Sequence, residues 1–210
     1  MRTRIAAALA VWTLACPLAS QQRRASAQRM EIDVERQSES GWKVVNPKTV
    51  FEQGDRIRFR FHSSFNGYLY VMNYGTSGGY TVLFPRQDTG RENRVAAGAG
   101  YVIPATDGVF RISGPPGHDV VYWLVSPVRL DRPGAESLVS PPRPATLLPR
   151  CDDTILRARG ECIDHGAGPS AGNDQRSRDL LFIEKEKRTV VAAPAPLEGP
   201  VVYEFRIAHR

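Results

Sequence analysis

Residues 55–61, DRIRFRF, decide the fold. Their apolar side chains alternate strictly with three arginines, which is the period-two pattern of a strand with one buried and one solvent-facing side. Phe65-Asn66-Gly67 follows, and an Asn-Gly pair is a strong hairpin signal. The sequence therefore predicts a strand, a hairpin turn and a returning strand over Gly67 to Tyr74.

The returning strand is aromatic or aliphatic at nearly every position, which predicts a central strand with both faces covered. Tyr80 to Phe84 resumes the pattern after a glycine-rich break, until Pro85 removes a backbone donor. These three strands are expected to form a meander. Further short candidates are Arg94 to Ala96, Tyr101 to Ile103, Val109 to Ile112 and Val120 to Val125.

Patterns outside this block are weaker. Met30 to Glu35 and Trp42 to Val45 predict an edge hairpin, and Val201 to Ile207 predicts a strand that closes the sheet. Leu180 to Ile183 fits a strand or a short helix. Residues 129–149 and 160–173 are rich in Pro, Gly, Ser and Ala, which predicts long loops. We expect a mainly β protein, an antiparallel β-sandwich of Ig-like or jelly-roll-like type, with its core over 28–128 and a loop-rich tail over 129–210.

Residues 1–27 predict a secretory signal. Arg2 and Arg4 precede an apolar run from Ile5 to Ala19, and Ala25-Ser26-Ala27 has the spacing of small residues that signal peptidase accepts. The run is shorter than the ~20 residues that span a bilayer, and we expect no transmembrane segment after it. Cleavage after Ala27 would release a periplasmic or extracellular protein. The other interpretation is a lipid anchor on Cys16 after a shorter signal.

The net charge of +6 belongs mainly to this segment. Four of the 28 Lys and Arg residues lie within residues 1–27, which leaves 24 basic against 22 acidic residues. A nearly balanced chain without a Lys/Arg cluster lacks the positive surface that neutralises several phosphates. We therefore expect no nucleic-acid partner.

Several short motifs follow one another in a recognisable order. They are Gly54-Asp55, Asn66 to Val71, Leu83-Phe84-Pro85, Asn93, Ala97-Gly98, Ile103-Pro104, Phe110, Gly114 to Gly117 and Trp123 to Ser126. In this order, residues 44–127 resemble the DUF4384 family, a bacterial domain of unknown function found in exported proteins. The resemblance implies a β-sandwich-like fold and brings no catalytic residues.

Cys151 and Cys162 would remain after loss of the signal. Two thiols in an oxidising compartment predict a disulfide that closes a local loop. Asp164 and His165 lie next to them, but the spacing differs from the paired ligands of a zinc site. We predict a disulfide, no metal site and no cofactor.

Two groups of residues are candidates for binding. Arg56, Arg58 and Arg60 stand ~7 Å apart along one strand face, where they would meet carboxylates or phosphates of a polymer. The other interpretation is a solvated outer face paired with nearby acids. The second group contains Tyr68 and Tyr70, with Tyr74, Tyr80 and Tyr101, which would stack on sugars or an extended peptide, or are ordinary sheet residues.

Gly75 to Gly79 resembles the nucleophile loop of trypsin-like proteases, but the sequence shows no matching histidine motif, which favours an inter-strand loop. The function we expect is a non-enzymatic interaction module at the cell envelope that binds a protein or polysaccharide partner. The alternative is an exported hydrolase with an unrecognised site, for which Asp55, His118 and Asp119 are the residues to inspect. The sequence does not indicate the oligomeric state.

Overall fold

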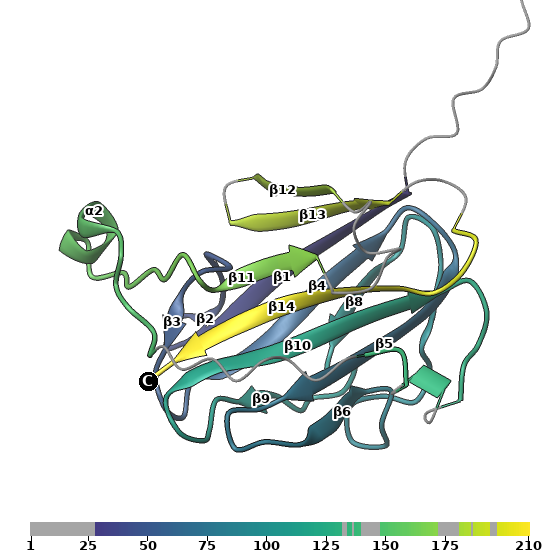
Figure 1. Ribbon diagram of the computed structural model, residues 1–210, viewed down its shortest axis with the longest axis horizontal. Helices are drawn as coiled ribbons and strands as arrows, with labels where there is room; N and C mark the ends of the chain where they lie inside the picture. Colours follow the sequence, from purple (N-terminus) through teal and green to yellow (C-terminus); the bar gives the residue numbers. More distant parts are fainter. Residues whose placement is uncertain are drawn as a thin grey trace, which may run out of the picture.

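A computed structural model describes residues 28–131, 134–135, 137–139, 148–171, 181–185, 187–193 and 197–210. The predicted signal, Ala27 and Cys16 lie outside these residues. The described chain forms two seven-stranded sheets that pack face to face (Figure 1). The predicted β-sandwich is therefore confirmed. In the described residues no helix combines the length and apolar character needed to cross a membrane.

One sheet, called the β1 sheet, has the order β12-β13-β1-β4-β8, with β2 beside β1 and β9 beside β4. Its strands are β1 (Gln28–Ser38), β2 (Gly41–Val45), β4 (Arg56–Ser63), β8 (Gly100–Ile103), β9 (Phe110–Arg111), β12 (Leu181–Lys185) and β13 (Arg188–Ala193). All pairings in this sheet are antiparallel.

The other sheet, called the β10 sheet, has the order β11-β14-β10-β5-β6, with β3 beside β14 and β7 beside β5. Its strands are β3 (Val50–Phe51), β5 (Gly67–Tyr74), β6 (Tyr80–Phe84), β7 (Arg94–Val95), β10 (Gly117–Ser126), β11 (Gly168–Ala171) and β14 (Val201–His209). The β3–β14 pair is parallel, and the other pairs are antiparallel.

The core fills the space between the sheets. Trp123 of β10 is fully buried and contacts rings from both layers, with centroid distances of 5.2 Å to Phe59, 5.8 Å to Phe61 and 6.1 Å to Tyr203. The apolar face of 55–61 thus packs against β10, as its alternation requires. A smaller apolar cluster covers the outside of the β10 sheet, where Tyr70, Met72 and Leu124 pack with Ala135 and Val139.

The predicted hairpin between β4 and β5 is wrong, because the two strands lie in different sheets. Both edges of β4 are already occupied, by β1 on one side and by β8 and β9 on the other. The chain therefore crosses between layers at Phe65 to Gly67, where the Ser63 hydroxyl donates to the carbonyl of Phe65 over 2.7 Å. The antiparallel pairing of β5 with β6 is confirmed, as is the central position of β5.

The flanking segments contribute more structure than their sequence suggests. β1 and β2 form the predicted hairpin, but β1 is an interior strand between β13 and β4 rather than an edge. Leu181 to Ile183 of the undecided segment belong to strand β12 (Leu181–Lys185), and β11 lies in the predicted loop 160–173. Because four strands after residue 129 enter both sheets, the boundary expected at 128/129 does not separate the sheets. A short helix, α2 (Thr154–Ala158), capped by Asp153, is also present.

Candidate functional site

The arginine row of β4 lies on the outer face of the β1 sheet, opposite acids of β1. Glu35 is almost buried, with 5% of its side chain exposed, and it binds both Arg58 (Nε to Oε2, 2.5 Å) and Arg60 (Nη2 to Oε1, 2.9 Å). Arg58 also lies over the Trp42 ring, 4.3 Å from its centroid. Arg56 donates to Gln37 over 3.3 Å. The pairing with nearby acids that we considered is therefore present, and Arg58 is committed to it.

A fourth arginine joins this face from the far end of the chain. Arg188 of β13 binds Asp33 through two nitrogens, Nε at 2.8 Å and Nη2 at 3.1 Å, and it also contacts Glu31 at 3.1 Å. Asp33 is buried, whereas 48% of the Arg188 side chain is exposed. Sequence reasoning missed Arg188. Only the pairing of β13 with β1 brings Arg188 close to the arginine row, because β1 lies next to β4.

Arg60 and Arg188 border one cleft of about 480 Å³. His62, Val102, Asp33 and Glu31 complete most of its wall. About half of the Arg60 side chain, 51%, is exposed beside the cleft. The acids beneath the two guanidinium groups fix their orientation, since a charge-assisted hydrogen bond holds each head in place.

Two buried carboxyl groups on opposite sheets have opposite pKa shifts. Burial raises the pKa of Glu35, but the hydrogen bonds and charges of Arg58 and Arg60 outweigh burial and hold its pKa below the ordinary value. Burial also raises the pKa of Glu204 on β14, and Arg206 at 3.8 Å offsets this only in part. Glu35 is thus held in its charged form, whereas burial disfavours the charged form of Glu204.

Glu35→Gln should lower the free energy of unfolding at pH 7, and Glu204→Gln should raise it. A carboxyl whose folded pKa is lowered stabilises the fold above its unfolded pKa, and this contribution is lost as pH falls through the folded pKa. The Glu35→Gln deficit should therefore shrink below the ordinary carboxyl pKa. The folded pKa of Glu204 is raised instead, so in the wild type ionisation of Glu204 lowers the free energy of unfolding as pH rises. Urea unfolding of both variants between pH 3 and 8 measures this; a Glu35→Gln deficit independent of pH would contradict it.

Two of the candidate tyrosines, Tyr68 and Tyr70, do not form an exposed stacking surface. Tyr70 is buried, and its hydroxyl both accepts from the Leu130 amide (2.7 Å) and donates to the Leu130 carbonyl (2.8 Å). It therefore fixes the chain after β10, and its burial leaves little of the ring for stacking on a ligand. Tyr68 is partly buried against the smaller apolar cluster on the outside of the β10 sheet. Tyr80, another of the candidates, is exposed, and its ring centroid lies 5.1 Å from that of Tyr74.

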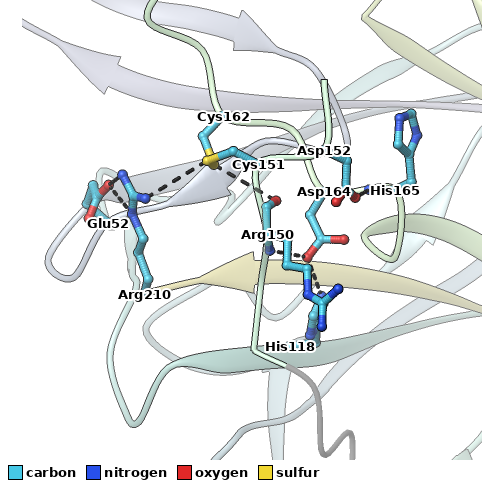
Figure 2. Close-up of a disulfide and its surroundings, with 9 residues drawn as sticks. All are labelled: Glu52, His118, Arg150, Cys151, Asp152, Cys162, Asp164, His165 and Arg210. Atoms are coloured by element: carbon cyan, nitrogen blue, oxygen red, sulfur yellow. Dashed lines mark hydrogen bonds and ion pairs between the residues drawn. A yellow bond between two sulfur atoms is a disulfide. The ribbon is translucent and has the colours of Figure 1, made fainter. Parts of the chain in front are cut away.

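The predicted disulfide is present, with Cys151 and Cys162 bonded and their Cα atoms 4.8 Å apart. Figure 2 shows Arg150 and Asp164, which flank the disulfide, beside His118 of β10. The loop is tied to the β3 side by two backbone bonds: the Val50 amide donates to the Cys162 carbonyl at 2.9 Å, and the Asp164 amide donates to the Lys48 carbonyl at 2.9 Å. A third bond, from the Asp152 amide to the Ile163 carbonyl at 2.7 Å, joins the two ends of the loop. Within the described residues, His, Cys, Asp and Glu side chains form no group of three suited to a metal ion.

His118 anchors the same loop to β10. Its Nε2 lies 3.1 Å from Oδ2 of Asp164, and only 9% of either side chain is exposed (Figure 2). Asp164 also accepts the amides of Arg150 (3.0 Å) and Gly166 (2.7 Å). A histidine far from any acid would have weakened the hydrolase alternative, and His118 has an acid beside it. The contacts of Asp164 are nonetheless those of a loop anchor.

The other residues considered for hydrolysis are separated. Asp119 accepts the Thr76 amide at 2.8 Å and lies 3.4 Å from Nε2 of the fully buried His209. Asp55 lies in a different turn, where it accepts the Glu52 amide at 3.0 Å. Asp119 thus holds the Gly75 to Gly79 loop through its backbone, as an inter-strand loop requires.

The architecture and these sites define a mainly antiparallel β-sandwich with a disulfide-closed loop and a charged outer face. The family model described as Domain of unknown function (DUF4384) matches residues 50–129, which confirms the resemblance. The match runs from β3 through β10, so the disulfide loop and β11 to β14 lie beyond it. Neither the curated proteins nor the solved structures contain a match to this chain.

Proposed function

We propose that this protein is exported and works at the cell envelope as a non-enzymatic binding module for a protein or polymer partner. The disulfide supports export, because such bonds form and persist in oxidising compartments. The predicted signal over residues 1–27 supports the same location.

The observation that carries the binding proposal is the pair of oriented, half-exposed guanidinium groups at one cleft. Arg60 and Arg188 come from two strands on either side of β1. Their inner nitrogens bind the buried acids Glu35 and Asp33, while about half of each side chain stays accessible. Groups already held in place lose little conformational freedom on binding. Planar guanidinium groups favour carboxylate or phosphate partners.

Capture of cross-linked partners from the extracytoplasmic fraction tests this proposal. Arg60→Gln should reduce capture about tenfold, because a bidentate charged contact contributes roughly 1.5–3 kcal/mol. The variant should stay folded, since Glu35 keeps Arg58. Arg157→Gln on the exposed surface of α2 is the matched control. Equal capture by wild type and Arg60→Gln would remove the cleft from the proposal, and absence of the protein from that fraction would contradict export.

The second candidate is an exported hydrolase, which the 3.1 Å contact between His118 and Asp164 favours. A histidine paired with a carboxylate is the base of many hydrolytic sites. Against it, the Nδ1 of His118 is buried without a partner, and Asp164 is occupied by two loop amides. Turnover of a peptide, ester or glycoside that disappears in His118→Ala would replace the binding proposal by this one.

A further inference from the structure

A second cleft, of about 700 Å³, shares no lining residue with the arginine cleft. It is enclosed by the β1–β2 hairpin, by the residues leading into β3 and by the disulfide loop at Gly160 to Cys162. These three walls come from distant parts of the sequence. The backbone bonds from Val50 and Asp164 hold the disulfide wall against the β3 side.

The cleft reaches the outer edge of β2. Three consecutive residues of this strand, Lys43, Val44 and Val45, line it, and so do Arg36 and Ser38 of β1. Arg36 and Lys43 are paired and share one face of the hairpin, whereas Val44 belongs to the opposite face, so the cleft covers that one face and extends to the edge at Val44. Among the described strands β2 pairs with β1 alone. Its other edge is therefore open toward the cleft.

The register identifies which backbone groups are free. β1 and β2 are joined by the two-residue loop Glu39-Ser40, and Ser38 pairs with Gly41. The pair next to such a loop exchanges both hydrogen bonds, and hydrogen-bonded pairs then alternate along the ladder. Arg36–Lys43 is thus a bonded pair, whereas the amides and carbonyls of Trp42 and Val44 point away from β1.

The charge of this cleft is positive. Its lining contains four basic side chains, Arg36, Lys43, Lys187 and Arg210, and two acidic ones, Glu52 and Glu161. Arg210 is paired with Glu52 at 2.8 Å, and Arg36 is 3.5 Å from Asp55. Within the described part of the chain Lys43 and Lys187 make no ion pair. Both are exposed.

We propose that an acidic, extended segment of a partner protein binds here by adding a strand to β2. Backbone bonds to Trp42 and Val44 would supply affinity, and the ammonium groups of Lys43 and Lys187 would select Asp or Glu side chains. The like charges of Lys43 disfavour the pairing of two β2 edges from two copies of this chain. This inference names a partner class within the proposed binding function, but it uses a surface separate from the arginine cleft.

The test uses a labelled peptide of alternating Glu and Thr, long enough to span β2, with fluorescence anisotropy as the measurement. The full mature chain is titrated with its disulfide intact. Lys43→Glu combined with Lys187→Glu should weaken binding by at least about tenfold. Val44→Pro should abolish it, because proline removes the outward amide without touching the ladder to β1. Arg157→Glu on α2 and Arg60→Gln should both bind as wild type does.

The peptide itself supplies a second measurement if Val44→Pro does not fold. Two peptides are compared, each N-methylated at every second amide. The peptide methylated at the amides that face β2 should not bind the unchanged protein, whereas the peptide methylated at the amides that face away should bind. Equal binding of the two methylated peptides would overturn strand addition. So would an acidic polysaccharide that binds more tightly than the peptide and whose binding Val44→Pro does not change. A dimer of the free protein that Val44→Pro dissociates would assign the edge to a second copy and would also overturn it. If Arg60→Gln captured partners as well as wild type, the arginine-cleft proposal would fail, but peptide binding at β2 would still stand.

Discussion

Trp123→Ala should lower the free energy of unfolding by about 3–5 kcal/mol, the range for removal of a large aromatic side chain from a core. Trp123 is fully buried at the centre of β10, and its ring contacts Phe59 and Phe61 from one sheet and Tyr203 from the other. The variant therefore removes the side chain that joins the two layers, and the cavity cannot close without moving both sheets.

Chemical denaturation followed by far-ultraviolet circular dichroism measures this loss. Leu148→Ala is the control, because 65% of Leu148 is exposed, and we expect a change within about 0.5 kcal/mol there. Trp123→Phe should fall between the two, since it keeps a ring but leaves part of the space empty. A Trp123→Ala variant as stable as Leu148→Ala would mean that the sheets do not share this core.

Cys151→Ser combined with Cys162→Ser should destabilise the fold by up to about 3 kcal/mol, because the bond restricts a loop in the unfolded chain. The loop has little apolar content of its own, and α2 within it has no buried residue. The folded loop nevertheless keeps its tie to β10 through His118 and Asp164. We therefore expect weaker stability with the sandwich retained.

Thermal unfolding of the double variant beside oxidised and reduced wild type checks this. Reduced wild type should unfold at the temperature of the variant, well below the oxidised protein. Asp164→Ala separates the contribution of the disulfide from that of the His118–Asp164 contact, because it removes this contact and keeps the disulfide. Identical unfolding of all four proteins would show that the loop adds nothing to the stability of the sheets.

The strands were predictable where burial is one-sided and local. The alternation in 55–61 predicted β4, and the apolar run after Gly67 predicted β5 with both faces covered. The cysteine pair predicted its bond, because two nearby thiols in an oxidising compartment are expected to form a disulfide. The same local signals could not say which strands pair. Phe65-Asn66-Gly67 reads as a hairpin, yet it crosses between sheets because β4 is already paired on both edges.

The candidate sites divide in the same way. Sequence alone determined a β-sandwich, an arginine row on the outside of β4 and a disulfide in the last third of the chain. Only the tertiary structure decided that Glu35 binds two of those arginines, that Arg188 joins them and that Tyr70 is buried. The physical reason is range: alternation and turn residues act over a few positions, whereas an ion pair such as Asp33–Arg188 depends on a register between strands more than a hundred residues apart.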